Sequence, residues 1–370
     1  MMKRSSGSHF LTPLALCLCL LGALTVAGCD RSQDQTVVRF WHFWSEPRQR
    51  AVVDSLIAEF ERRHPGLQVE TTVLSWADGK SKLQLAFNAG TQPDVVHLGG
   101  DWFAEFDSAD LFEQTSEEHG MDNGNRASRW LVNARALVYD VRRSTGLPIG
   151  GLCVSDPHNV IKRVLPLLWL KGSRLYTRLP LSGDLTDSLA GTIWEVVTSS
   201  PTAIRDRSRQ LDEQLLRGQI GSVLTGAWIV DLARQQNNSY LRVLPLPSIL
   251  NTDVLAISKT STSKNAARDL VSFLCQYDNS RAFSLSVSDA GFPADLWTAS
   301  QDSVFLRDSL RRGFLQTAMI SMPLVHSAKL LRVEPIIEDM MERCYAANSK
   351  EHVIACVRSA RQQVLLAESR

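Results

Sequence analysis

The chain contains 370 residues, and its 40 Lys and Arg residues almost balance its 39 Asp and Glu residues. This near-zero net charge argues against nucleic acid as a partner. With 44% hydrophobic residues the composition is that of an ordinary globular protein, and the length indicates two lobes rather than one simple core.

The N-terminus has the layout of an export signal. Two basic residues precede an apolar run at residues 10–27, and the small residues at its end lead to Cys29. The sequence Val-Ala-Gly-Cys at this point resembles the lipobox of bacterial lipoproteins. The resemblance implies that residues 1–28 are a signal peptide and that Cys29 is lipidated. The alternative is a transmembrane anchor, but small residues directly before a cysteine suit a peptidase better than a bilayer.

Lipidation would determine where the protein resides. Dual acylation, with palmitate as one of the chains, holds a protein stably at a membrane, whereas a single chain binds only marginally. Residues 29–36 are polar and would act as a tether. By resemblance to lipoproteins, Asp30 favours retention at the inner membrane. We therefore expect an exported protein anchored to the outer face of the cytoplasmic membrane, on the periplasmic side in a Gram-negative cell.

Residues 37–102 alternate between predicted strands and helices. Strands are predicted at 37–44, 67–74 and 93–98, with helices that begin near Pro47 and at Lys82. β-Branched and aromatic residues favour the strands, and an i, i+3, i+4, i+7 apolar stripe from Val53 to Phe60 favours the first helix. Such alternation implies a parallel sheet with right-handed crossovers.

Four side chains follow the ends of these strands: Trp44, Glu46, Asp101 and Trp102. Ligands of open α/β sheets lie beyond the carboxyl ends of the strands, so these residues are candidate ligand contacts. For Asp101 the alternative is a helix N-cap, and one side chain could do both.

The second half continues with the same kinds of element. Helices are predicted at 160–170, 185–199 and 204–217, and strands at 134–140, 218–224 and 252–258. Two further helices near the C-terminus carry Cys344 and Cys356 on their apolar stripes. Counted from the turn between these helices, the two cysteines differ in height by about 4 to 6 Å. A disulfide and two buried thiols both remain open.

Several short segments, taken in order, resemble one known family. They are Phe40–Glu46, Asn88–Val96 and Gly218–Trp228, together with the His-Pro-Gly that ends the first predicted helix. Their order and spacing resemble the extracellular solute-binding proteins of carbohydrate ABC importers, such as the maltose-binding and glycerol-phosphate-binding proteins. The resemblance covers roughly half of the mature chain.

The resemblance implies an α/β fold of the type II periplasmic-binding-protein kind. Each of two lobes would have a central, mostly parallel sheet flanked by helices, with a cleft and a hinge between the lobes. Residues 37–136 with 252–296 would form the N-terminal lobe, and residues 137–251 with 297–370 the C-terminal lobe. The segment between Asp140 and Gln219 lacks the family's proline-rich approach to the cleft and its Thr-Trp dipeptide, so the second lobe departs from the family pattern.

A pyranose has an apolar face of C–H groups and a rim of hydroxyls. Its site therefore favours indole rings for the face and carboxylates for the rim, each charge-assisted hydrogen bond contributing about 1.5 to 3 kcal/mol. The predicted ligand-binding residues are Trp44, Glu46, Asp101, Trp102, Trp169, Gly226, Trp228 and Phe292. In the family the aromatic at the position of Trp228 often stacks on sugar, and Gly226 would let the backbone approach the ligand. Phe292 could equally pack at the hinge.

No catalytic motif emerges. The sequence contains neither the Gly-x-Ser-x-Gly of serine hydrolases nor the His-Glu-x-x-His of zincins. His42 and His97 follow strands, but no third ligand accompanies them, so no metal and no cofactor is predicted. We expect a binding protein and not an enzyme, although a glycosidase pair of carboxylates stays open because two acids can converge from anywhere in the chain.

The predicted function is that of a monomeric lipoprotein that captures a carbohydrate and delivers it to the permease subunits of an ABC transporter. One alternative keeps the fold but binds a glycerol-phosphate-type ligand, for which Arg135, Arg174 and Arg178 are candidate partners. Another is a sensory or interaction lipoprotein without transport, suggested by the shortened segment of the second lobe.

Overall fold

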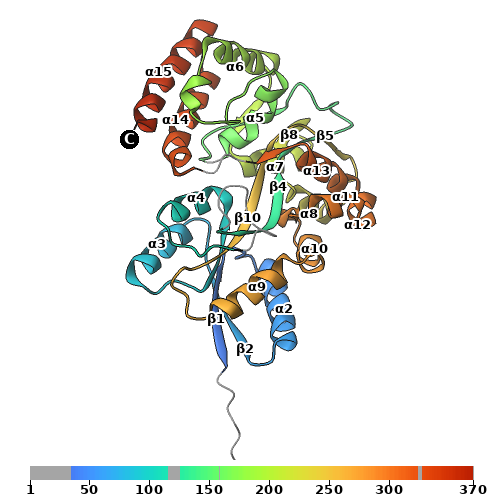
Figure 1. The fold of residues 1–370 in the computed structure, drawn as a ribbon. Helices are drawn as coiled ribbons and strands as arrows, with labels where there is room; N and C mark the ends of the chain where they lie inside the picture. Colours follow the sequence, from blue (N-terminus) through green and yellow to red (C-terminus); the bar gives the residue numbers. More distant parts are fainter. Residues whose placement is uncertain (1–34, 116–125, 158, 324–326, 370) are drawn as a thin grey trace, which may run out of the picture.

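A computed structural model describes residues 35–115, 126–157, 159–323 and 327–369 (Figure 1). The predicted signal peptide, the lipidation site Cys29 and most of the tether lie outside these residues. Among the helices that the model describes, none is long and apolar enough to cross a membrane.

The chain forms two bodies, each built around its own sheet (Figure 1). The first sheet has the order β11-β4-β10-β3-β1-β2, and β12 pairs with β10. Its strands are β1 (Thr36–His42), β2 (Leu67–Val73), β3 (Val95–Gly99), β4 (Ser128–Ala134), β10 (Ile249–Ile257), β11 (Phe292–Pro293) and β12 (Met322–Pro323). The second sheet has the order β7-β6-β8-β5-β9. Its strands are β5 (Ala136–Asp140), β6 (Gly151–Cys153), β7 (Ile204–Asp206), β8 (Ser222–Thr225) and β9 (Leu241–Leu244).

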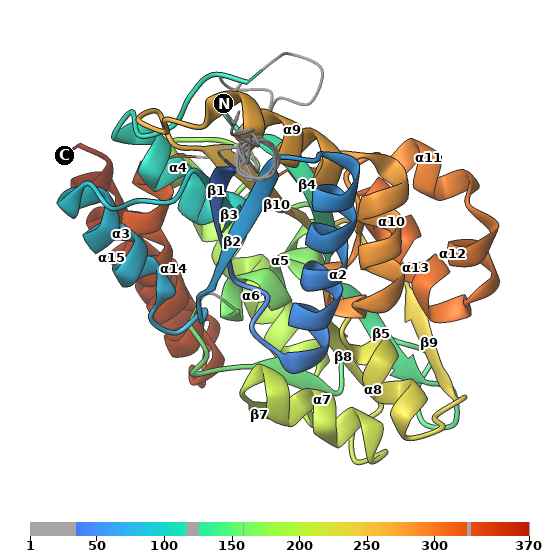
Figure 2. The same cartoon turned by 90° about the horizontal axis from the view of Figure 1, so that it is seen from below.

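Helices cover both faces of the first sheet. They are α2 (Pro47–Arg63), α9 (Lys264–Cys275) and α10 (Tyr277–Ser286) on one face, with α3 (Gly79–Ala89) and α4 (Gly100–Ser108) on the other (Figure 2). The predicted stripe of α2 is confirmed, because Val53, Leu56, Ile57 and Phe60 are all buried.

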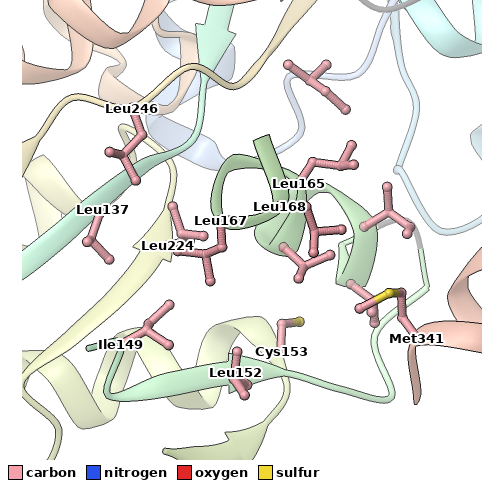
Figure 3. Packing of buried hydrophobic residues seen from close by; sticks show 14 of the residues in the cluster. Leu137, Ile149, Leu152, Cys153, Leu165, Leu167, Leu168, Leu224, Leu246 and Met341 are labelled. Atoms are coloured by element: carbon pink, nitrogen blue, oxygen red, sulfur yellow. The ribbon is translucent and has the colours of Figure 1, made fainter. Parts of the chain in front are cut away.

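The second sheet has a larger helical cover. Its helices are α5 (Val160–Leu170), η2 (Leu181–Gly183), α6 (Asp187–Ser199), α7 (Ser208–Leu216), α8 (Ile229–Gln235), α11 (Leu296–Gln301), α12 (Ser303–Arg307), α13 (Ser309–Met319), α14 (Ala328–Tyr345) and α15 (Lys350–Glu368). Both views place α14 and α15 on the opposite side of this lobe from α11, α12 and α13 (Figures 1 and 2). Leucines of α5 fill the space above β6, with Leu165, Leu167 and Leu168 packed in one buried cluster (Figure 3).

The two-lobe α/β fold is as predicted, but its sheets are mixed rather than mostly parallel. Strands β1, β2 and β3 are parallel, as their helical crossovers require. In contrast, β10 runs antiparallel to β3 and β4, and β5 runs antiparallel to β8 and β9. The chain leaves the first sheet through β4, builds the second sheet, and comes back into the first sheet through β10, which runs in the opposite direction beside β4.

The chain changes sheets at Arg135, the single residue between β4 and β5. The sequence predicted one strand over this stretch, whereas the structure divides it at that residue. A second change lies between β9 and β10, before Ile249. The lobe boundaries given above stay a prediction, and β12 of the first sheet falls within the range predicted for the second lobe.

Candidate ligand-binding cleft

A cavity of about 1040 Å³ lies between the two bodies. We call the residues on either side its two walls. The first-lobe wall comprises Trp76, Gly99–Trp102, Asn251–Asp253, Asn133 and Asp289. The second-lobe wall is made by the start of α5, by α7, and by α8 with its two capping residues, from Asp156 to Gln236. Arg135, on the crossing between the sheets, joins the two walls.

Aromatic rings support the first-lobe wall. The Trp76 ring stacks on Phe43 with centroids 4.6 Å apart, and it meets Trp102 at 5.0 Å. Trp76 and Trp102 both line the cavity, and 45% of Trp76 is exposed. Indole surface left accessible beside a cavity is suited to the C–H face of a sugar ring.

Asp101 lines the cavity in the first turn of α4. Its Oδ1 accepts the backbone N–H of Trp102, and its Oδ2 lies 3.3 Å from Nζ of Lys162. Lys162 belongs to α5, so this ion pair joins the two lobes across the cavity. The N-cap of α4 is Gly99, and the capping alternative for Asp101 is therefore wrong.

A buried ion pair supports the second-lobe wall. Arg163 on α5 donates from both Nη atoms to the two oxygens of Asp212 on α7, at 3.1 and 3.0 Å. Trp228 donates its indole N–H to Asp212 Oδ2 at 2.8 Å. One carboxylate therefore fixes both a guanidinium and the aromatic ring beside it.

Trp228 lines the cavity, and two cations approach its ring. The guanidinium carbons of Arg135 and Arg163 lie 5.4 and 5.9 Å from the ring centroid, within cation–π range. A Cβ at Gly226 would overlap this indole. Gly226 does not line the cavity, so the close approach that its lack of a side chain permits is that of Trp228.

Charge is divided unequally between the walls. Every basic side chain that lines the cavity comes from the second-lobe wall or from Arg135, whereas the first-lobe wall contributes only the acids Asp101, Asp253 and Asp289. The cavity therefore has an acidic, aromatic side and a side that carries all of its cations.

Residues 44–146 match the model of a family described as bacterial extracellular solute-binding protein. This match covers 103 of the 370 residues. It is 31% identical over 98 residues to an uncharacterized lipoprotein in the oleD 5′ region of Streptomyces antibioticus, a match that covers 26% of this chain and 22% of the relative. It is also 24% identical over 138 residues to the putative ABC transporter periplasmic-binding protein YcjN of Escherichia coli K12, covering 37% of this chain and 32% of that protein. The chain thus spans less than a third of the length of either relative.

Solved structures extend the likeness to the whole fold. The sugar-binding protein MalE of Xanthomonas citri superposes with a TM-score of 0.72 at 18% identity, covering 90% of this chain and 98% of MalE. The description of the matched family names a binding protein, which is the class that the sequence predicts.

Only some of the predicted contact residues line the cavity. Asp101, Trp102 and Trp228 do, whereas Trp44, Glu46, Trp169, Gly226 and Phe292 do not. Sequence reasoning missed Asp212 and Arg163, which lie 49 residues apart on two helices and carry no local signal.

Other contacts explain the positions of these outlying residues. Trp44 is 5% exposed and stacks on His97 with centroids 5.4 Å apart. Glu46 is the N-cap of α2 and forms a capping box with Gln49. Each of these side chains is therefore engaged in the fold of the first lobe.

The remaining two residues are likewise engaged in packing. The indole N–H of Trp169 donates to the carbonyl of Leu175 at 2.8 Å. Phe292 is buried with its ring edge-on against Phe305. It therefore packs inside the protein, which is the alternative that the sequence left open, and it does not line the cavity.

The two histidines form no metal site. His97 accepts the Phe43 backbone N–H at Nδ1, and its Nε2 lies 3.6 Å from Asp253. Burial, with smaller contributions from His97 and Arg50, lowers the pKa of His42 to about 3. Across the described parts of the chain, no three His, Cys, Asp or Glu side chains are placed to hold a metal ion.

Cys344 and Cys356 are buried free thiols on α14 and α15. Burial raises the pKa of Cys344 to about 12, and the adjacent Cys356 contributes to the rise. The sequence left a disulfide and two buried thiols open, and the structure shows two buried thiols.

Proposed function

We propose that this protein is a membrane-anchored solute-binding lipoprotein that captures a carbohydrate or sugar derivative in the cavity between its lobes and delivers it to an ABC permease. The observation that carries the proposal is the cavity itself, which has exposed indole surface on one wall, Trp228 on the other, and carboxylates beside both. The relatives described as a sugar-binding protein, a lipoprotein and an ABC transporter periplasmic-binding protein support it.

The mechanism follows from the division into two walls. A ligand that contacts both walls binds the closed arrangement better than an open one, and it shifts the population toward closure. The crossings of the chain near Arg135, before Ile249 and after Pro293 would act as the hinge. In this proposal the protein works as a monomer, and Cys29 holds it at the outer face of the cytoplasmic membrane.

Titration of a saccharide panel with tryptophan fluorescence and thermal unfolding tests the binding step. We expect a fluorescence change and a raised Tm for at least one saccharide, because ligand binding stabilises the folded state. Trp76→Ala should weaken the response, whereas Trp297→Ala should not, since Trp297 is 73% exposed and remote from the cavity lining. A panel without any response would refute carbohydrate capture.

The membrane step needs a separate test. Metabolic labelling with a radioactive fatty acid should mark the wild-type chain and leave Cys29→Ser unlabelled. Labelling of both variants, or of neither, would contradict the anchoring at Cys29.

A further inference from the structure

Arg135 differs from the other basic side chains around the cavity. Lys162 pairs with Asp101, Arg163 pairs with Asp212, and both Arg209 and Arg217 pair with Glu213. Among the basic residues that the structure describes in the cavity lining, Arg135 alone has no carboxylate within ion-pair distance.

The guanidinium of Arg135 is held in place by neutral groups. Its Nη2 donates to the amide oxygen of Asn159 at 2.6 Å, and its carbon lies over the Trp228 ring. Its Nε is buried and has no hydrogen-bond partner. Burial, followed by repulsion from Arg163, lowers the pKa of Arg135 to about 10. A cation removed from water in this way, without a carboxylate at ion-pair distance, is a group that an arriving anion would stabilise.

The acids around the cavity do not supply that counterion, because each has other contacts. Asp156 accepts hydrogen bonds from Asn159 and from the Ser208 backbone, and Asp289 accepts one from Gln49. Asp253 lies 3.6 Å from the ring of His97. Arg135 therefore lies on the crossing between the lobes with no carboxylate at ion-pair distance, and the more distant carboxylates Asp156 and Asp212 only partly offset its charge.

The start of α5 adds to the same electrostatic field. Asn159, which holds Arg135, is the N-cap of this 11-residue helix. Helix N-termini carry partial positive charge and unpaired backbone N–H groups, which favour anions. Arg135 and the N-terminus of α5 therefore both favour an anionic ligand.

We infer that the ligand is a sugar that bears an anionic group, a carboxylate or a phosphate, and that Arg135 receives this group. The inference rests on the proposed function, because it specifies the ligand class of the same cavity. The structure also selects among the arginines that the sequence left open, since Arg174 and Arg178 are exposed and do not line the cavity. A planar guanidinium fork fits both carboxylate and phosphate, so the two groups must be separated by experiment.

The test compares neutral sugars with anionic counterparts that keep at least one ring in common. Glucose, glucuronate and glucose 6-phosphate are titrated calorimetrically, and the set is repeated with maltose and maltobionate. Glycerol 3-phosphate and inorganic phosphate serve as anions without a sugar ring. We expect at least one anionic sugar to bind about tenfold or more tightly than its neutral counterpart, in line with a charge-assisted hydrogen bond. Tighter binding of glucuronate would identify the anionic group as a carboxylate, and tighter binding of glucose 6-phosphate would identify it as a phosphate.

Arg135→Gln should abolish this preference, and Arg135→Lys should retain part of it because the charge remains while the fork is lost. The matched control is Arg307→Gln, which removes one positive charge from an exposed site on α12 that does not line the cavity. If the glutamine variant fails to fold, the salt dependence of wild-type binding decides, because only the anionic ligands should bind more weakly as salt is raised from 50 to 500 mM in the assay.

Each outcome has a distinct meaning. Equal binding of neutral and anionic sugars by the wild type, or a preference that survives Arg135→Gln, overturns the inference and leaves the proposed function intact. Binding of inorganic phosphate or glycerol 3-phosphate as tight as that of the anionic sugars overturns the sugar component of the inference. No binding by any sugar, neutral or charged, overturns the proposed function itself.

Discussion

The two walls of the cavity are supported by different physics. Rings stacked on rings hold the first-lobe wall, through Phe43, Trp76 and Trp102. The second-lobe wall depends on one buried carboxylate, Asp212, which holds Arg163 and Trp228. Ring packing is tolerant of salt and of small shifts, whereas a buried charge depends strictly on its partner. The two walls should therefore respond differently to the same kinds of change.

The largest effect should come from removing the centre of the second-lobe wall. Asp212→Ala would leave Arg163 buried and uncompensated, which costs about 3 to 5 kcal/mol of unfolding free energy. Urea unfolding measures this loss. Glu213→Ala is the matched control on the same helix, because its ion pairs are exposed and contribute about 1 kcal/mol or less. Equal losses in the two variants would show that the buried pair does not support the wall.

A smaller effect is expected from Gly226→Ala. The new Cβ would overlap the Trp228 ring and force it to move, at a cost of about 1 to 3 kcal/mol. The measurement is thermal unfolding together with the fluorescence of the bound and free protein. Gly183→Ala is the control, since no atom lies within 4 Å of its added Cβ. An unchanged Tm in Gly226→Ala would mean that the indole can turn away without loss.

Acid should affect the first lobe through His42. The folded-state pKa of His42 is lowered to about 3, so the unfolded chain binds a proton there first as pH falls. This contribution to stability is complete above about pH 6.5 and decreases as pH falls toward 3, by about 1 to 2 kcal/mol at pH 5. His42→Leu should flatten the dependence measured by urea unfolding, and the exposed His352→Gln should leave it unchanged. A profile in His42→Leu as steep as that of the wild type would rule out this origin.

The smallest effect concerns the contact between the walls. Lys162→Met removes the ion pair with Asp101, which is only partly buried, and should favour an open arrangement by about 1 kcal/mol or less. Small-angle X-ray scattering of the ligand-free protein should show a larger radius of gyration. Lys171→Met is the control, because its pair with Glu195 is exposed and remote from the cavity. An identical radius in all three proteins would mean that this pair does not influence closure.

Local sequence predicted residues of the first-lobe wall better than residues of the second-lobe wall. Asp101 and Trp102 follow β3 directly, and their place at the cavity was predicted from the rule that ligands lie beyond strand ends. The same rule failed for Trp44, which also follows a strand, because its ring turns inward onto His97. A strand end locates a residue along the chain but does not determine the direction of its side chain.

The sequence by itself determined the alternation of strands and helices over the first lobe, the buried stripe of α2 and the family likeness, because these depend on residues close together in the chain. Only the tertiary structure decided the second-lobe wall, where Arg163 meets Asp212 from 49 residues away. It alone also decided that Arg135 has no carboxylate partner among the described residues of the cavity lining. The physical reason is that charge compensation is a property of distance in space, and no spacing along the chain records it.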